Sequence, residues 1–252
     1  MSTEIQTAVG RFVWHDNIST GPDRAKDFYS QLFGWETEVF GEGTMDYPMI
    51  KVGEQNHGGY GKADEGVPSQ WTGHVLVEDV DETARKAEGA GGSVVTGPMD
   101  IPEVGRFAVI ADPQGAVLSV FASYGDAPQS QGVFVWDELV TTDVEAAREF
   151  YGEIFGWTYA TMDSAMGSEY TIFKRAGNVD TAGAMVRPEG MEAPPHWVVY
   201  IGTDDVDATV ERATQLGATV FMGGMDISNV GRIAVLQDPV GAVFGLFKPA
   251  EA

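Results

Sequence analysis

Two carboxylates, Asp16 and Glu138, are suited by type and position to acid–base chemistry. Each follows a tryptophan by two residues, Trp14 in the first case and Trp136 in the second. Because side chains alternate along a strand, each carboxylate should share a face with its tryptophan. Carboxylic acids in apolar surroundings have raised pKa values and can act as general bases near neutral pH. A structural hydrogen bond to loop backbone is the alternative role for both.

Among the four histidines, His74 is the one expected on the same kind of face. It follows Thr72 by two residues on a predicted strand, and the equivalent pair later in the chain is Val198 and Tyr200. An imidazole can take or give a proton near neutral pH. With the two carboxylates, it completes the predicted catalytic set.

The elements that must position these residues belong to a long internal repeat, which should be interpreted before any single motif. The pattern Phe-Tyr-x₃-Phe-Gly-Trp occurs at residues 28–35 and again at 150–157. The pattern Asp-Pro-x-Gly-Ala-Val occurs at 112–117 and again at 238–243. The chain is therefore predicted to contain two copies of one domain.

The predicted domains are residues 1–122 and 132–252, joined by a polar linker at 123–131. Within each domain the order strand, helix and three strands occurs twice, which predicts an α+β fold of four such modules. The elements expected in the first domain are strand 11–19, helix 22–33, strands 36–40, 47–52 and 57–62, strand 71–77, helix 80–89, and strands 93–97, 106–111 and 116–121.

Most other repeated residues are interpreted as structural. The Phe-Gly-Trp segments should end helices and pack in the core. Trp71 and Trp197 should pack there too. Arg106 and Arg232 each begin a strand near Asp112 and Asp238, and we expect each arginine to form a surface ion pair.

Composition excludes several classes of function. The chain has 252 residues, a net charge of −23 and no cysteine. Such acidity disfavours nucleic acid and anionic lipid as partners. We interpret the charges mainly as a solvated acidic surface. No signal peptide or membrane-spanning run is visible. Without cysteine there are no disulfides or thiol nucleophiles, which fits a cytoplasmic protein.

Paired β-α-β-β-β modules with these Phe-Tyr, Phe-Gly-Trp and Asp-Pro-x-Gly motifs resemble the vicinal oxygen chelate superfamily. This superfamily includes glyoxalase I, bleomycin-resistance proteins and extradiol dioxygenases. The resemblance is closest to two-domain glyoxalase-like proteins of actinobacteria, often labelled hydroxylases, and it covers nearly the whole chain. It implies curved sheets that enclose clefts, but this fold hosts metal enzymes and metal-free binders alike.

The resemblance also implies where a metal would be held, on the first and last strands of each module. Here those positions are occupied by residues that bind divalent cations poorly: Trp14, Trp136, Thr72, Val198, Ser119 and Gly245. We therefore expect no cofactor, and neither glyoxalase I nor dioxygenase activity. A rebuilt site using His74 with Asp16 or Glu138 is the remaining way to bind a divalent metal.

The inner faces of such sheets should form clefts with aromatic walls, which would stack on a flat conjugated ligand. The predicted ligand-binding residues are Trp14, Trp136, Tyr200, Thr72, Met49 and Tyr60. Modules that pair within a half place Asp16 with His74. Modules that pair across halves place Glu138 with His74, and Asp16 with Tyr200. Either way only one cleft holds a histidine, and we expect that cleft to be the active one.

Three functions follow in order of preference. The first is metal-independent binding of an aromatic or polycyclic small molecule, as in resistance by sequestration. The second is a metal-independent natural-product enzyme, an isomerase, cyclase, lyase or hydroxylase. The third is a metal-dependent glyoxalase or dioxygenase. The expected partner is the small molecule alone, bound by a monomer with pseudo-dimeric halves or by a homodimer.

Overall fold

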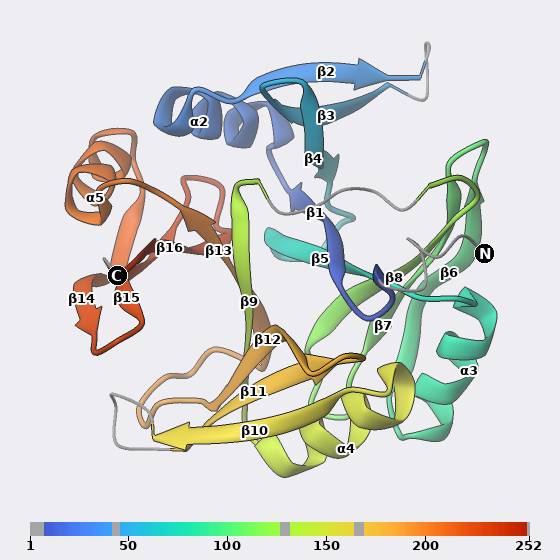
Figure 1. Ribbon diagram of the computed structural model, residues 1–252. Helices are drawn as coiled ribbons and strands as arrows, with labels where there is room; N and C mark the ends of the chain where they lie inside the picture. Colours follow the sequence, from blue (N-terminus) through green and yellow to red (C-terminus); the bar gives the residue numbers. More distant parts are fainter. Residues whose placement is uncertain (1–7, 42–45, 127–131, 164–168, 251–252) are drawn as a thin grey trace. The chain divides into compact units, whose positions relative to one another are not determined.

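Four modules of one strand, one helix and three strands make up the computed structural model of the chain (Figure 1). The structure describes residues 8–41, 46–126, 132–163 and 169–250. The observed class is α+β, and the order of elements within each module is the predicted one. No helix in these described ranges has the length and apolar character needed to cross a membrane.

The first half of the chain holds two modules. The first contains β1 Phe12–Ser19, α2 Pro22–Phe33, β2 Glu36–Phe40, β3 Tyr47–Val52 and β4 Gln55–Lys62. The second contains β5 Gln70–Leu76, α3 Val80–Gly89, β6 Ser93–Ile101, β7 Gly105–Ala111 and β8 Val117–Ser123.

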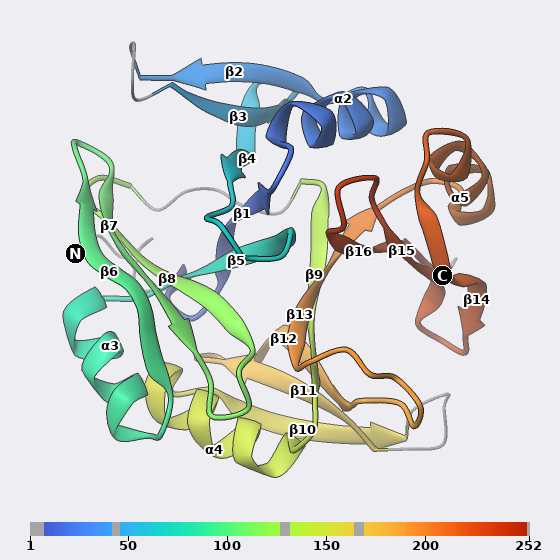
Figure 2. The same cartoon turned by 180° about the vertical axis from the view of Figure 1, so that it is seen from behind.

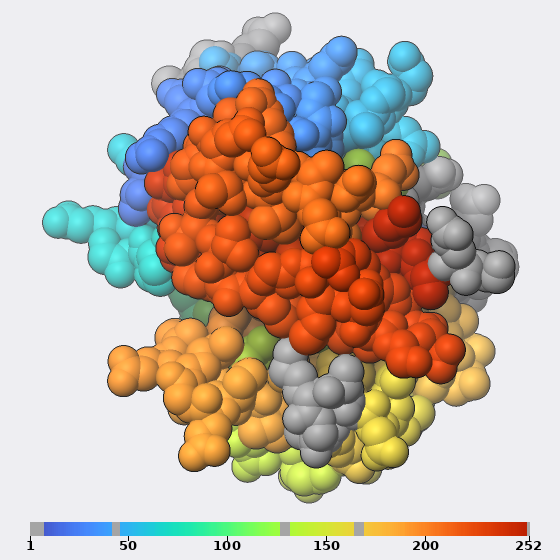
Figure 3. Space-filling model, turned by 90° about the vertical axis from the view of Figure 1, so that its left-hand side faces the viewer, coloured from blue at the N-terminus to red at the C-terminus, as the bar shows by residue number. Residues whose placement is uncertain are grey.

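The second half repeats this order. The third module contains β9 Phe134–Thr141, α4 Val144–Phe155, β10 Thr158–Asp163, β11 Glu169–Arg175 and β12 Val179–Val186. The fourth contains β13 His196–Gly202, α5 Val206–Gln215, β14 Thr219–Ile227, β15 Gly231–Gln237 and β16 Val243–Pro249. Figure 3 shows the surface of this fourth module in orange to red.

The helices begin and end at the residues that their sequences indicate. In α4 the side chain of Asp143 accepts a hydrogen bond from the backbone N–H of Ala146, which caps the first turn. Gly156 ends the same helix with a φ of 67°, a left-handed conformation that favours glycine. Gly34 ends α2 in the same way with a φ of 72°.

One predicted strand is longer than expected. The segment predicted as 93–97 continues as β6 to Ile101. Register shifts between β6 and β7 at Val94/Thr96 and Thr96/Met99 show why: bulges let the strand continue past residues that usually end one.

Two open, mixed sheets of eight strands each follow the two halves of the chain. The first has the order β2-β3-β4-β1-β5-β8-β7-β6, and the second has the order β10-β11-β12-β9-β13-β16-β15-β14. Within each sheet the first and last strands of a module pair in parallel, as β1 does with β4 and β5 with β8. A parallel pair therefore closes each of these modules.

The hydrophobic cores are organised differently, because the chain divides into two compact units that each take one module from each half. Unit 1 comprises residues 1–14, 73–129 and 136–197, and unit 2 comprises residues 15–72, 130–135 and 198–252. In unit 1, α3 packs on β6, β7 and β8, and α4 packs on β10, β11 and β12 (Figure 2).

The buried residues of each unit come from both halves. In unit 1, Leu118 of the second module shares a core with Tyr151 and Phe173 of the third. In unit 2, Tyr29 of the first module shares a core with Leu236 and Phe244 of the fourth. The core of each unit is therefore built from modules of different halves. The division at the linker 123–131 stays a prediction, and residues 127–131 of that linker lie outside the described residues.

Candidate functional site

The repeated Phe-Tyr and Asp-Pro motifs meet inside the cores. In unit 2 the Tyr29 hydroxyl donates a hydrogen bond to Oδ2 of Asp238 at 3.0 Å, and Trp71 Nε1 donates to the same hydroxyl oxygen at 2.8 Å. Asn17 also donates to Asp238. Burial and the neighbouring Asp238 carboxylate raise the pKa of Tyr29 well above its usual value, so the phenol stays protonated.

Unit 1 repeats this network. The Tyr151 hydroxyl donates to Asp112 at 3.0 Å and accepts from Trp197 Nε1 at 3.2 Å. The other Asp112 oxygen accepts from the backbone N–H of Gln114 and Ala116. Burial raises the pKa of the Asp112 carboxyl despite these hydrogen bonds. The structure thus places both aspartates and both tryptophans in buried polar networks of the cores, where their geometry serves folding.

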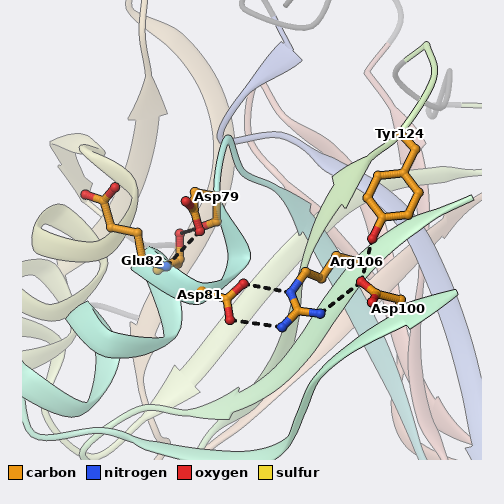
Figure 4. Close-up of polar contacts among 7 residues, drawn as sticks. Asp79, Asp81, Glu82, Asp100, Arg106 and Tyr124 are labelled. Atoms are coloured by element: carbon orange, nitrogen blue, oxygen red, sulfur yellow. Dashed lines mark hydrogen bonds and ion pairs between the residues drawn. The ribbon is translucent and has the colours of Figure 1, made fainter.

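The predicted surface ion pair of Arg106 is confirmed, and its partners lie on α3 and β6. Arg106 forms a bidentate pair with Asp81 on α3, at 2.7 and 3.0 Å, and a second pair with Asp100 on β6 at 2.9 Å (Figure 4). Tyr124 also donates to Asp100. Arg106 lowers the pKa of the Asp81 carboxyl by hydrogen bonding. The oxygens of Asp112 are occupied inside the core, whereas Asp81 lies at the exposed start of α3.

Arg232 follows the same rule in unit 2. It pairs with Asp207 on α5 and with Asp226 on β14, at 2.8 and 2.9 Å. These exposed pairs tie a helix start to an edge hairpin in each unit. Surface ion pairs contribute little individually, so they are fold features.

Several of the candidate site residues, among them Trp14 and Asp16, are half-buried. Along β1, Trp14, Asp16 and Ile18 are half-buried, whereas His15 and Asn17 between them are buried. The alternation that the sequence predicts is therefore present, and His15 faces away from Asp16. His15 packs against Phe134 with the two rings tilted and 4.4 Å between their centroids.

Side-chain exposure distinguishes Trp14 and Trp136 from the other four tryptophans. Four of the six tryptophans are buried to 6% exposure or less: Trp35, Trp71, Trp157 and Trp197. Trp14 and Trp136 are half-buried. These two tryptophans are thus the ones with partly exposed indole rings.

A polar bridge crosses the sheet at Glu138 in unit 1. Tyr170 on β11 donates its hydroxyl proton to Oε2 of Glu138 on β9 at 2.8 Å. Trp136 Nε1 donates to the same phenol oxygen at 3.0 Å. Burial and the Glu138 carboxylate raise the pKa of Tyr170 well above its usual value, so the phenol keeps its proton at neutral pH.

The bridge depends on a glycine, because β12 lies between β11 and β9. Gly183 on β12 is the register partner of both Ile172 and Glu138. A Cβ atom at Gly183 would lie 1.8 Å from the Tyr170 hydroxyl and 2.9 Å from Trp136 Nε1. The absent side chain is what allows the phenol to pass over the middle strand.

An equivalent bridge lies in unit 2. Tyr47 on β3 donates to Asp16 on β1 across β4. A Cβ atom at Gly59 of β4 would lie 2.0 Å from the Tyr47 hydroxyl. Each bridge thus consists of a tyrosine, a glycine and a carboxylate at equivalent places in the two halves. We call them the Glu138 bridge and the Asp16 bridge.

Sequence reasoning missed both tyrosines of the bridges. The signal was present in the repeat: the tyrosine follows its carboxylate by 31 residues in one half and 32 in the other. Met49, by contrast, was predicted. It is the register partner of Gly59, so it shares the face of Asp16 and is half-buried.

Tyr60 lies on the opposite face from the predicted one. Its register partner is Asn17, a buried residue of the core face, and its ring packs beside Tyr29 in unit 2. Burial raises the pKa of Tyr60. Tyr60 therefore does not share a face with Asp16.

The remaining candidates divide between the units. His74 is half-buried on β5, with Ser119 of β8 as its register partner, and lies in unit 1 with Glu138. Thr72 and Tyr200 are buried in unit 2 with Asp16. The Tyr200 ring covers Gly245, where a Cβ atom would lie 2.3 Å from the ring. The grouping by unit is the one expected from pairing across halves.

The residues at the expected metal-ligand positions do not fit a metal. They are indole, hydroxyl, aliphatic and glycine positions, which offer no set of imidazole and carboxylate donors. Within the described ranges no group of three or more His, Cys, Asp or Glu is arranged to hold one. We derive no chemical step through a metal.

Solved structures share this fold. A Mn(II)-bound glyoxalase from Novosphingobium aromaticivorans aligns with a TM-score of 0.63 at 16% identity, over 95% of this chain and 82% of that one. The 2,3-dioxygenase LapB from Pseudomonas sp. KL28 aligns with a TM-score of 0.63 at 12% identity, over 97% and 95%. These modules therefore define a protein with the fold of glyoxalases and extradiol dioxygenases.

Sequence comparison makes the assignment specific. Residues 18–120 match the Glyoxalase/Bleomycin resistance protein/Dioxygenase superfamily model, and residues 134–247 match a glyoxalase-like domain. "Putative glyoxylase CFP32" of Mycobacterium tuberculosis is 35% identical over 94% of each chain. Anthracycline biosynthesis protein DnrV of Streptomyces peucetius is 33% identical over 97% of this chain and 95% of that one. The chain belongs to the glyoxalase/bleomycin resistance protein/dioxygenase superfamily, as its motifs predicted.

Proposed function

We propose that this protein binds a flat aromatic or polycyclic small molecule on the half-buried faces that carry Trp14 and Trp136, without a metal ion. The observation that carries the proposal is the Glu138 bridge, which holds a half-buried tryptophan next to a carboxylate. The equivalent Asp16 bridge lies on the strand of the other half-buried tryptophan.

The bridge prepares Trp136 for stacking. Because its N–H is donated to Tyr170 at 3.0 Å, the indole plane is fixed before any ligand arrives. A fixed ring loses little conformational entropy on binding, and its face stacks on conjugated molecules. A few polar groups beside an aromatic surface are typical of small-molecule sites.

The names of two full-length relatives agree with this ligand class. DnrV and DauV, at 33% and 32% identity, are called anthracycline biosynthesis proteins. Anthracyclines contain a planar polycyclic ring system, which matches what two half-buried indoles would stack on. We therefore take a planar polyketide-like aromatic as the ligand, and we propose binding in the cytoplasm in keeping with the cysteine-free sequence.

Calorimetric titration with an anthraquinone tests the proposal. Trp136→Ala and Trp14→Ala should each weaken binding at their own site roughly tenfold or more, because stacking and buried apolar area are lost. Phe221→Ala is the matched control, since Phe221 is an aromatic residue of an edge strand and is 57% exposed. Equal losses in the control, or no loss in the tryptophan variants, would contradict the proposal.

An enzyme on the same site is the second candidate, favoured by the pairing of a carboxylate with a protonated phenol. Glu138 would take a proton from the ligand as general base, with Tyr170 holding the carboxylate in place. If the protein is an enzyme, two further residues would accept protons: His74 in the same unit and Asp16 in the other unit. Chromatography of the ligand after incubation with the protein distinguishes an enzyme from a binding protein. Turnover that Glu138→Gln and Asp16→Asn abolish without loss of binding would show catalysis. A ligand that stays unchanged would show binding alone.

A further inference from the structure

Two different pairs of side chains occupy the same place in the two halves of the chain. In the first half, His74 on β5 is the register partner of Ser119 on β8. In the second half, Tyr200 on β13 is the register partner of Gly245 on β16. The first pair lies in unit 1 and the second in unit 2, so each unit contains one such pair and one bridge.

The Tyr200 ring lies on the backbone of β16. A Cβ atom at Gly245 would lie 2.3, 2.4 and 2.7 Å from Cδ1, Cε1 and Cγ of Tyr200. The ring therefore rests directly on the glycine, which is possible because glycine has no side chain. In the first half Ser119 carries a Cβ atom, and its hydroxyl donates to the backbone oxygen of Ala108 at 3.1 Å. An aromatic ring cannot lie on that residue in the same way.

Tyr200 is buried on the strand face that the core does not use. Its side chain is only 4% exposed. The next residue along β13, Ile201, belongs to the hydrophobic core of unit 2, and so does Leu246 next to Gly245. Because side chains alternate along a strand, Tyr200 and Gly245 point to the opposite face. The equivalent His74 is half-buried, so the first half leaves more of this face exposed.

We propose that Tyr200 is a specificity-determining residue, whose ring occupies the place of a ligand ring on β13 and β16, so that the ligand binds preferentially beside His74. The inference rests on the proposed function, and it gives Tyr200 a different role from the ligand contact that the sequence predicts. A flat ligand can bind on β13 and β16 only after it displaces a ring that already covers them. The duplication therefore yields two unequal sites.

The size of the difference follows from the displacement of one buried aromatic ring. Exposing such a ring to water weakens binding roughly tenfold to hundredfold. An imidazole has less apolar area than a phenol ring, and His74 is already partly exposed, so a ligand displaces less there. We therefore expect the Kd values of the two sites to differ at least tenfold.

Calorimetric titration of the whole chain with an anthraquinone tests the inference. Wild type should show one tight site and a second site that is at least tenfold weaker or below detection. Tyr200→Ala removes the ring, so the second site should tighten toward the first. Tyr200→Phe is the matched control, since it keeps a ring over Gly245 and should retain the difference.

A reciprocal exchange provides the second arm, because each variant uses residues that the chain itself has at the equivalent place. Tyr200→His/Gly245→Ser should give two tight sites. His74→Tyr/Ser119→Gly should leave no tight site, with binding at least tenfold weaker than in wild type. Circular dichroism of each variant checks the fold. A purely structural role of Tyr200 would not change the number of tight sites in opposite directions.

The outcomes are distinguishable. Two equal sites in wild type, or no tightening in Tyr200→Ala, would overturn the inference while leaving ligand binding intact. Weaker binding to Tyr200→Ala than to wild type would also overturn it, because the ring would then be a contact of the ligand. Failure of wild type to bind the anthraquinone would overturn the proposed function and this inference together.

Discussion

Substituting Gly183 with alanine should break the Glu138 bridge without removing any of its polar groups. The new methyl group would lie 1.8 Å from the Tyr170 hydroxyl and 2.5 Å from its Cζ atom. Such distances are far inside van der Waals contact, so the phenol must leave its position. The hydrogen bonds of 2.8 Å to Glu138 and 3.0 Å from Trp136 then break together.

The magnitude follows from these two bonds. A neutral hydrogen bond contributes about 1 kcal/mol and one to a charged group about 1.5–3 kcal/mol, which gives about 2.5–4 kcal/mol for the pair. The groups are half-buried, so water can replace part of this, and alanine fits a strand better than glycine. We therefore expect the free energy of unfolding of unit 1 to fall by about 1–3 kcal/mol.

Urea unfolding, followed by circular dichroism, measures this change. The midpoint should fall while the m-value stays constant. Gly89→Ala is the control in the same unit, because a Cβ atom there meets nothing within 4 Å; it should be neutral or slightly stabilising. A Gly183→Ala protein as stable as the Gly89→Ala protein would show that the bridge does not stabilise unit 1.

Three further predictions concern the cores, the histidines and metal. Tyr151→Phe removes the buried hydroxyl between Asp112 and Trp197, so it should lower the free energy of unfolding by about 2–3 kcal/mol. Tyr159→Phe, at an exposed position, should change it little. Thermal denaturation of the two variants measures the difference. Burial, with repulsion from His15, lowers the pKa of His57, so just below pH 6.5 the unfolded chain binds more protons than the folded one. The free energy of unfolding should therefore decrease as the pH is lowered through that window, and more steeply in wild type than in His57→Gln. Parallel slopes in urea titrations at several pH values would count against this. Dialysis against EDTA should leave affinity for an anthraquinone unchanged, and recovery of binding only on adding Mn(II) would show that a metal is needed.

Much of the fold follows from local signals in the sequence. The bounds of β2, β3 and α3 were predicted to the residue, because capping residues, glycines and alternating apolar residues punctuate them. The faces of β1 were predicted as well, since Trp14 and Asp16 alternate with buried neighbours. The superfamily followed from the repeated motifs.

The rest depends on contacts between distant segments. Tyr60 was assigned to the wrong face because glycines flank it on both sides along β4, so no alternation of apolar residues indicates which face it occupies. A register shift between β3 and β4 at Ile50/Lys51 also interrupts the regular pairing of these strands. The surface ion pair of Arg106 was predicted without a partner, because Asp81 lies on a helix and is 25 residues away in the sequence.

The bridges show the same limit. Tyr170 meets Glu138 only because strand order and register bring Gly183 between them, and no window of sequence contains that information. Comparison of the two halves does contain it, since the tyrosine, the glycine and the carboxylate recur together at equivalent positions.

Calorimetric titration of metal-free protein with a hydroxyanthraquinone is the decisive measurement of metal-independent ligand binding. We expect saturable binding to wild type, and its loss in the double variant Trp14→Ala/Trp136→Ala with the fold intact by circular dichroism. Absence of binding to the metal-free protein, or equal binding to the double variant, would contradict it.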